Sequence, residues 1–437
     1  MSQQDLHLSH YASFEQGRAG VDPEWLGPLR RRALDRFSSL GFPTMRHEDW
    51  KYTSVAAISG GEFHPFTGEL PEADVDALGY GDWPCARLVF INGRFAPESS
   101  SIQGLPDGVR VGSLAAMLDS DPDELEGHLG RYAAFEEQAF TALNTAFLED
   151  GAFLSIEDGV HVELPIHLLF ISSTNGRPFV AHPRNLILVG KRSQVTLYES
   201  YLSSAAGAYW TNAVTEIVGA EGARIEHIRV QHEGALGHHV GTVQTQLGRD
   251  AGYTSHVVSL GGALVRNELN VILDGQGSEC TLNGLYVAGG VEHVDNHTLV
   301  DHTQPNASSR ELYKGILTDE AHGVFNGRII VREDAQKTDS RQTNKNLLLS
   351  RNALVDTKPQ LEIFANDVKC AHGATVGQID RDAIFYLQTR GIGEEESRHM
   401  LVHAFAAELV DVIPAEPVRA ALTAALVNRL SPSGAAA

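Results

Sequence analysis

Turn-forming residues recur along the middle of this chain at a nearly constant interval. The turn clusters are Arg192-Ser193, Glu221-Gly222, Asp250-Ala251, Gly275-Gln276-Gly277, Pro305-Asn306 and Asp334-Ala335. They stand 27 to 29 residues apart, and further breaks fall near the midpoints, at Ala206, Leu236, Gly262, Gly290 and Glu320. Each period therefore holds two extended segments of about ten residues, which is typical of a stacked repeat. Because a propeller blade needs about 40 residues and four strands, the spacing favours a parallel β-solenoid. A β-sandwich stays open as an alternative, since turns every 8 to 12 residues also describe that class.

Helical periodicity precedes the repeat. A first helix places Leu29, Ala33, Phe37 and Leu40 on one face and ends at Gly41 and Pro43, and a second aligns Phe135, Ala139, Leu143 and Phe147 and closes at Gly151. Between them, the apolar run in 87–95 with Asn92-Gly93 predicts a strand entering a hairpin.

Helical periodicity also follows the repeat. We expect helices over 380–390, from Glu394 to Pro414, and around Val418, Leu422, Leu426 and Leu430. The chain is thus divided into an N-terminal helical and mixed domain (1–150), a β-helix core (151–377), a C-terminal helical domain (378–430) and a disordered tail (431–437). The apolar faces of the C-terminal helices exceed what a cap of the core needs, so part of this surface is expected to bind a partner.

The net charge and the cysteines limit which partners the chain can bind and in which compartment it is expected. The formal net charge of −22 disfavours nucleic acid and anionic membrane surfaces. The odd number of well separated cysteines, Cys85, Cys280 and Cys370, forms neither a disulfide framework nor a paired zinc motif. With no secretory signal and no long apolar run, the expected location is the cytoplasm.

Motifs of common catalytic chemistries are missing from the sequence. It contains no GxxxxGK[ST] loop, no GxSxG elbow and no HExxH, so ATP hydrolysis is not expected of this chain. His399 and His403 have the i, i+4 spacing of a metal-binding pair, but no third ligand accompanies them. Two further groups, His293, His297 and His302, and His232, His238 and His239, are interpreted as solvated turn histidines.

The segment Lys369-Cys370-Ala371-His372-Gly373 carries the sharpest local chemistry. In a strand, alternate side chains share a face, so Cys370 and His372 are expected to project together. A thiolate beside an imidazole suits iron or zinc, although two ligands are too few for a closed site. A buried structural cysteine beside a hydrogen-bonded histidine, and a nucleophilic cysteine activated by the histidine, are the alternatives.

Several long motifs in the C-terminal part of the sequence match one family. They are Tyr313-Lys314-Gly315, the run 342–350 (QTNKNLLLS), Thr357-Lys358-Pro359, the run 367–377 (DVKCAHGATVG) and the run 385–392 (FYLQTRGI). Together with the early run 48–53 (EDWKYT), they closely resemble the SufB/SufD family of iron–sulfur cluster assembly scaffold proteins, in its SufD branch. The resemblance is dense over residues 310–413 and looser elsewhere.

The resemblance implies a right-handed parallel β-helix between helical terminal domains. It also implies a cytosolic complex with a SufB-like paralogue and a SufC-like ABC ATPase, with the helical C-terminus binding the ATPase. A homodimer of the isolated chain stays open. Cys370 and His372 then become candidate iron or cluster ligands shared at the SufB interface, with no cofactor held stably by the isolated chain and a transient iron or cluster in the complex.

Two departures separate the chain from SufB-like sequences. These carry a cysteine where this chain has Ala353 and an acid where it has Gly373, so the expected contribution is one or two ligands to a shared site. The expected function is a non-catalytic scaffold subunit that takes part in iron acquisition and cluster assembly. The alternative is a metal-dependent β-helix enzyme using Cys370 and His372.

Overall fold

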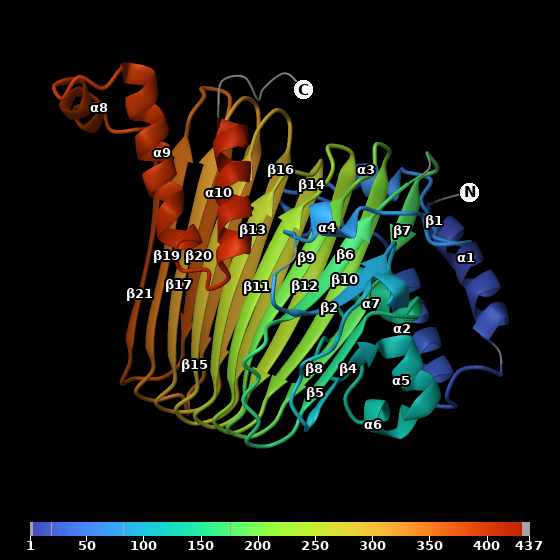
Figure 1. The fold of residues 1–437 in the computed structure, drawn as a ribbon. Coiled ribbons are helices and arrows are strands. Elements are labelled where there is room, and N and C mark those ends of the chain that lie inside the picture. Colours follow the sequence, from blue (N-terminus) through green and yellow to red (C-terminus); the bar gives the residue numbers. More distant parts are fainter. Residues whose placement is uncertain (1–2, 19, 82, 175, 431–437) are drawn as a thin grey trace.

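The computed structural model describes residues 3–18, 20–81, 83–174 and 176–430. Its body is a parallel β-solenoid of two facing sheets whose strands alternate along the chain (Figure 1). One sheet has the order β20-β18-β16-β14-β12-β10-β8-β5-β4, and the other has β21-β19-β17-β15-β13-β11-β9-β6-β2-β3. We call them the even and the odd sheet. The solenoid that the turn spacing favours over a propeller or a sandwich is confirmed.

The solenoid strands have nearly equal lengths in the middle of the chain. Those of the even sheet are β5 (Ala152–Ile156), β8 (Arg184–Val189), β10 (Tyr209–Gly219), β12 (Gly237–Leu247), β14 (Leu264–Leu273), β16 (His293–His302), β18 (His322–Val331) and β20 (Leu354–Ile363), with β7 (Phe179–Ala181) beside β10. Those of the odd sheet are β6 (Ile166–Ser172), β9 (Gln194–Ser203), β11 (Arg224–His232), β13 (Gly252–Leu260), β15 (Glu279–Ala288), β17 (Ser308–Leu317), β19 (Asp339–Leu348) and β21 (Lys369–Gly377).

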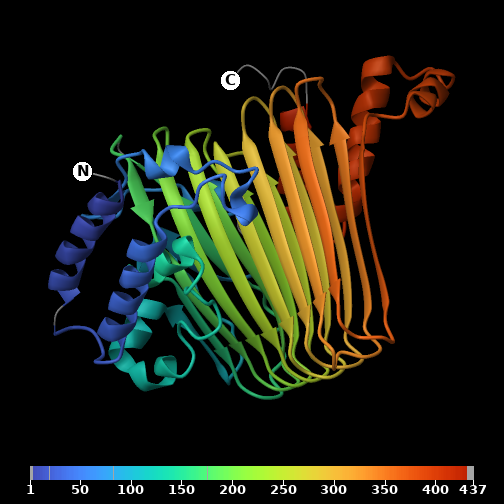
Figure 2. The same cartoon turned by 180° about the vertical axis from the view of Figure 1, so that it is seen from behind.

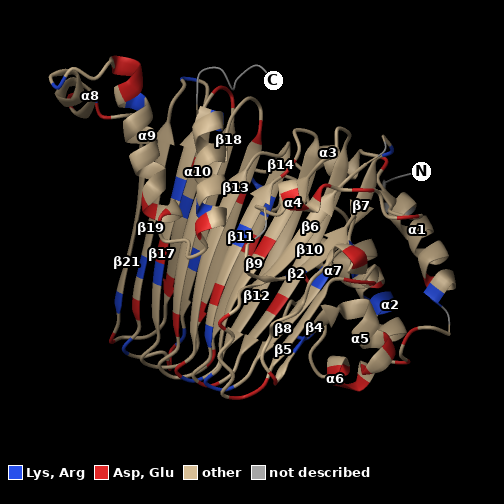
Figure 3. Cartoon of the chain, viewed as in Figure 1, with Lys and Arg blue, Asp and Glu red and all other residues tan. Residues whose placement is uncertain are grey.

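One row of turns explains the repeat seen in the sequence. Each turn places a residue in the left-handed backbone region, where glycine, asparagine and aspartate are the least strained. These residues are Arg192, Gly222, Asp250, Gly277, Asn306 and Lys337, with φ between 53° and 73°. The N–H of each donates to a carbonyl in the next turn, as from Asp250 to Gln276 at 2.9 Å and from Asn306 to Gln336 at 2.9 Å. This row of turns forms the lower edge of the solenoid in Figure 3, and many of the chain's acidic and basic residues lie along it.

Most helices of the N-terminal region lie on the outer face of the even sheet (Figure 2), whereas the segment around α4 packs on β2, β6 and β9 of the odd sheet. Its helices are α1 (Gln3–Arg18), α2 (Leu26–Leu40), η1 (Glu48–Trp50), α3 (Ala56–Ser59), α4 (Val75–Leu78), η2 (Pro97–Ser99), α5 (Leu114–Ser120), α6 (Pro122–Glu126) and α7 (Ala139–Ala146), and its strands are β1 (His64–Pro65), β2 (Ala86–Ile91), β3 (Arg94–Phe95) and β4 (Val109–Ser113). Phe37, Phe140 and Trp210 meet in one buried cluster. The helix ended by Gly41 and the hairpin at Asn92-Gly93 are confirmed as α2 and β2–β3.

The second N-terminal helix is shorter than expected. Helix α7 begins at Ala139, so Phe135 lies before it, although the Phe135 side chain is buried. Tertiary contacts explain the shorter helix: the N–H groups of Tyr132 and Ala133 donate to the Glu216 carboxylate of β10 at 2.8 and 2.9 Å. These bonds hold the preceding backbone as a loop and prevent an earlier helical start.

Three C-terminal helices follow the solenoid, where the sequence predicts them: α8 (Arg381–Gln388), α9 (Glu394–Val410) and α10 (Glu416–Leu430). Helices α9 and α10 bury Val402, Leu409 and Leu422 against the outer face of the odd sheet. Helix α8 projects past the last strands (Figure 1). The buried apolar side chains of α9 and α10 therefore cover the flank of the solenoid and leave its end open. No helix among the described residues is long and apolar enough to cross a bilayer. The predicted tail, 431–437, lies outside the described residues, and the predicted domain boundaries stay a prediction.

Candidate functional site: the open end of the solenoid

Cys370 and His372 lie on β21, the last strand of the odd sheet, farthest from the N-terminal helices (Figure 1). Strand β21 pairs with β19 so that Cys370 is opposite Ser340 and His372 is opposite Gln342. Both Ser340 and Gln342 are buried inside the solenoid, whereas Arg341 between them is exposed. The two candidate ligands thus continue the interior face of the odd sheet, and the prediction that they share a face is confirmed.

The two side chains differ in burial. Cys370 is half-buried and packs against the apolar interior of the solenoid. Burial raises the pKa of its thiol, which disfavours the thiolate that binds metals. His372 is exposed, because the interior face that it continues has no further turn over it among the described residues. The imidazole of His372 is therefore the more accessible of the two candidate ligands.

Polar side chains line the interior behind this pair. Glu311 is opposite Gln342 in the next strand inward, so Glu311, Gln342 and His372 form one column across β17, β19 and β21. Gln342 Nε2 donates to Glu311 Oε2 at 2.7 Å. Burial raises the pKa of Glu311 to about 7. A carboxyl group that is half protonated near neutral pH thus lies two strands inside His372.

A second polar column runs beside the first and ends at Cys370. His302 Nε2 lies 3.0 Å from Ser309 Oγ, and Ser309 Oγ lies 2.7 Å from Ser340 Oγ. Ser340 is in turn opposite Cys370. Sequence reasoning missed both columns. The signal that could have found them is the spacing within a column, because positions 311, 342 and 372 differ by 31 and 30 residues, close to one period.

The edges of both sheets are bare at this end. Strands β20 and β21 terminate their sheets among the described residues, and no described strand pairs with their outer sides. Large apolar side chains are exposed here, namely Leu354, Ile363, Phe364 and Val376. An unpaired edge strand offers its free N–H and C=O groups to another chain. The end therefore has the character of an interaction surface.

Ala353 and Gly373 differ in what they could accommodate. Ala353 is 7% exposed and belongs to the interior apolar cluster. A Cβ added at Gly373 would meet no atom within 4 Å. Packing within this chain would therefore allow an acidic side chain at position 373.

The other histidines singled out in the sequence do not gather into a metal site. Among the described residues, no group of three or more His, Cys, Asp or Glu side chains could hold a metal ion. His399 and His403 lie on α9 and belong to no such group among the described residues. The interpretation of the two histidine groups as solvated turn residues is wrong for His238, which is buried in β12, and for His239 and His302. The last two are fully buried, His239 beside Glu233 (Nδ1 to Oε1, 2.8 Å) and His302 beside Ser309, because strand residues here face a polar interior.

The motif Tyr313-Lys314-Gly315 has a structural explanation. Lys314 faces outward and holds α9, where its ammonium donates to the Phe405 carbonyl at 2.7 Å and pairs with Glu408. The neighbouring Gly315 leaves room for the Tyr286 ring, since a Cβ there would lie 2.4 Å from a ring carbon. This motif therefore shapes the packing of the interior and attaches α9 to the odd sheet.

The run 48–53 docks onto the even sheet. The guanidinium of Arg266 lies 3.8 Å from the centre of a Trp50 ring and donates to the Asp49 carbonyl at 2.8 Å. Thr53 donates to Asp295 of β16. Glu48 pairs with Lys358 of β20, the last strand of the even sheet. This motif thus ties the N-terminal region to the same end of the solenoid that carries His372.

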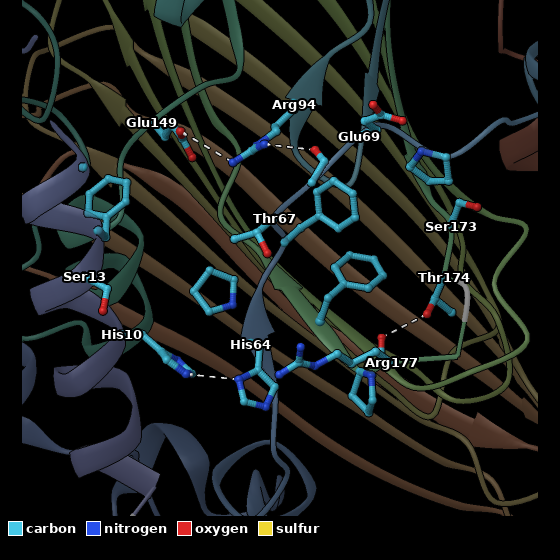
Figure 4. A pocket seen from close by; sticks show the side chains of 18 of the residues that line it. His10, Ser13, His64, Thr67, Glu69, Arg94, Glu149, Ser173, Thr174 and Arg177 are labelled. Atoms are coloured by element: carbon cyan, nitrogen blue, oxygen red, sulfur yellow. Dashed lines mark hydrogen bonds and ion pairs between the residues drawn. The ribbon is translucent and has the colours of Figure 1, made fainter.

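A large pocket of about 970 Å³ lies at the opposite end, between α1 and the segment around β1 (Figure 4). His10 and His64 meet in it, with Nε2 and Nδ1 3.2 Å apart, and Arg94 approaches Glu149 at 4.0 Å. It contains neither Cys370 nor His372. The pocket is therefore separate from the chemistry that the sequence points to.

Comparisons with known proteins agree with the fold and with the motifs. The family "SUF system FeS cluster assembly, SufBD core domain" matches residues 170–405, and the "SufBD protein N-terminal region" matches residues 1–168. The chain therefore belongs to the SufBD family of SUF-system iron–sulfur cluster assembly proteins. It is 33% identical over 410 residues to the iron–sulfur cluster assembly protein SufD of Escherichia coli, covering 93% of this chain and 94% of that protein.

Two further relatives have the same extent. An iron–sulfur cluster assembly SufBD family protein of Synechocystis is 33% identical over 407 residues, covering 91% of this chain and 89% of the relative. SufD of Bacillus subtilis is 26% identical over 424 residues, covering 94% and 95%. The resemblance that the sequence motifs indicate is thus confirmed at the level of the family.

Proposed function

We propose that this chain is the SufD-like, non-catalytic subunit of a cytoplasmic SUF scaffold, which pairs with a SufB-like paralogue and binds a SufC-like ATPase. The observation that carries the proposal is the open end of the solenoid. Among the described residues both sheets end there in an unpaired strand, and one of these strands, β21, carries Cys370 and His372 near exposed apolar side chains. A paralogue with the same solenoid could continue both sheets across this end and bury those side chains. At the N-terminal end the sheets end instead in β4, which α5 contacts, and in the two-residue strand β3.

His372 and Cys370 are proposed to bind iron or a nascent cluster together with groups of the partner. Iron is here the cargo of the scaffold. His372 is the first ligand, because its side chain is exposed and imidazole is the commonest metal ligand in proteins. Cys370 is the second, and its thiol must lose a proton against the effect of burial. Two ligands from this chain leave the rest of the coordination to the partner.

The surface proposed for the ATPase is α8 with the start of α9. Phe385, Tyr386 and Met400 are exposed there, with Phe385 at 66% and Tyr386 at 58%. The apolar faces of α9 and α10 are engaged with the odd sheet, so they are not available to a partner. ATP chemistry is assigned to that partner, since this sequence has no phosphate-binding loop.

The decisive experiment replaces His372 by alanine in the assembled complex. We expect the subunits to co-purify as before and cluster formation on the scaffold, followed by anaerobic visible absorption, to be lost. His403→Ala, an exposed histidine on α9, is the matched control and should leave cluster formation unchanged. Normal cluster formation in an intact His372→Ala complex would contradict the ligand assignment, and loss of association would indicate a structural contact instead.

A second experiment tests the ATPase surface without disturbing the core. The double variant Phe385→Ser/Tyr386→Ser should keep the stability of the chain and weaken association with the ATPase at least tenfold, because exposed aromatic residues dominate such contacts. Val412→Ser, at another exposed apolar position, is the control. Unchanged binding of the ATPase by the double variant would remove α8 from the proposed surface.

A further inference from the structure

The amide of Gln342 holds a buried hydrogen-bond acceptor that no described residue uses. Gln342 is 1% exposed and its Oε1 has no hydrogen-bond partner. An unpaired buried acceptor costs about 1–3 kcal/mol, so a partner is expected. The residue opposite Gln342 on the outer side is His372, whose imidazole carries an N–H donor.

Two neighbours fix which way this amide faces. Its Nε2 donates to Glu311 Oε2 at 2.7 Å. Across the interior, β18 has Gly327, where a Cβ would lie 2.3 Å from Nε2 and 2.8 Å from Cδ of Gln342. The amide is thus packed against the backbone of the even sheet with its nitrogen engaged, which leaves the carbonyl oxygen as the group available to the next strand.

We infer that Gln342 is a positioning residue for His372. When a partner covers the end of the solenoid, Gln342 Oε1 accepts a hydrogen bond from one imidazole nitrogen of His372. That bond selects the tautomer and directs the other ring nitrogen, with its lone pair, toward the iron. Glu311 acts one step further back by holding the Gln342 amide in this orientation. The inference rests on the proposed role of His372 as a ligand and extends it to the residues behind.

Such support is common where histidine binds a metal. A ligating imidazole usually donates its second N–H to a carboxylate, a carbonyl or water, which fixes the ring and raises its basicity. Here the acceptor is an amide carbonyl, and the carboxyl group of Glu311 lies behind it. The arrangement also explains why a glutamine with one unused oxygen is placed inside the solenoid.

The test measures binding of Co²⁺, as a visible stand-in for ferrous iron, to the complex of this chain with its SufB-like partner under anaerobic conditions. Removal of a supporting hydrogen bond typically costs 10- to 100-fold in metal affinity, so Gln342→Leu should weaken Co²⁺ binding by about that factor. The double variant Glu311→Gln/Gln342→Glu exchanges donor and acceptor but keeps an acceptor opposite His372. It should bind Co²⁺ within about threefold of the unchanged chain.

Controls separate this inference from the proposal on which it rests. Ser259→Ala removes a buried interior hydroxyl from β13, two strands further from the open end than β17, and it should leave Co²⁺ affinity unchanged. His372→Ala should abolish the site, and retained binding would overturn the ligand assignment together with this inference. If His372→Ala abolishes binding while Gln342→Leu binds normally, only the role of Gln342 is overturned. The role of Gln342 is also overturned if Gln342→Leu binds Co²⁺ weakly and Glu311→Gln/Gln342→Glu binds it equally weakly. Loss of packing would then explain the effect.

Discussion

Replacing Glu216 by glutamine tests how the N-terminal region is attached to the solenoid. The Glu216 carboxylate is fully buried, lies 2.7 Å from Nη2 of the equally buried Arg184, and accepts N–H bonds from Gly130, Tyr132 and Ala133 at 2.8 to 2.9 Å. The substitution keeps the size of the side chain but removes its charge and places an amide against several donors. The guanidinium of Arg184 is then left buried without its counterion.

The expected loss follows from these contacts. Breaking a buried ion pair by removing one partner costs about 3–5 kcal/mol, and the loop 130–133 loses charge-assisted hydrogen bonds as well. We expect Glu216→Gln to lower the free energy of unfolding by about 4 kcal/mol, a large share of the roughly 5–15 kcal/mol of a typical domain. Urea unfolding followed by circular dichroism measures the loss, and hydrogen exchange should show faster exchange at 130–133.

A matched control uses a carboxylate in a less buried pair. Glu226 of β11 is 33% exposed and lies 3.6 Å from His256, so Glu226→Gln should cost less than about 1 kcal/mol. If Glu216→Gln also costs less than about 1 kcal/mol, the reasoning that a buried charge network holds the N-terminal region is wrong.

Three further predictions follow from the interior and from the C-terminal contacts. The pKa of Glu311 is about 7 in the folded chain and 4.5 in the unfolded chain, so the folded chain holds a proton there between these pH values. The free energy of unfolding should therefore fall by at most about 3 kcal/mol between pH 4.5 and 7 and stay constant above pH 7. Urea unfolding at several pH values should show this slope, and Glu311→Gln should remove it. Gly315→Ala should cost about 1–3 kcal/mol by overpacking, measured as a lower Tm, whereas Gly373→Ala should change nothing. Lys314→Ala should loosen α9, seen as faster proteolysis between Gly377 and α9 at unchanged β-sheet content.

The repeat could be predicted because its turns depend on local chemistry. Gly222, Asp250, Gly277 and Asn306 are residue types that tolerate a left-handed backbone, so their spacing is visible in the sequence. The last turn was predicted at Asp334-Ala335, whereas its left-handed residue is Lys337. Lysine has no preference for that conformation, and the turn is held instead by the bond from its N–H to the Asp367 carbonyl in the following turn. The sequence alone does not reveal that bond.

The candidate site was predictable only in its outermost layer. The period of two along one strand is sufficient to place Cys370 and His372 on the same face. The positions of Glu311 and Gln342 behind them depend on the register of β17, β19 and β21, which a single sequence does not give directly. For the same reason the burial of His302 was missed, since its partner Ser309 belongs to the next strand along the chain.

The two ends of the solenoid differ in a way that bears on its function. At the N-terminal end, β4 pairs antiparallel with β5, and the β2–β3 hairpin extends the odd sheet. A bare edge is an aggregation risk that folded proteins usually cover, so the exposed β20 and β21 need a reason to persist. The polar columns behind Cys370 and His372 supply one, because buried hydroxyl, amide and carboxyl groups are costly in an interior that could have been apolar. Open edges and a polar interior at the same end are both accounted for if another chain completes the sheets there and shares the metal cargo with His372.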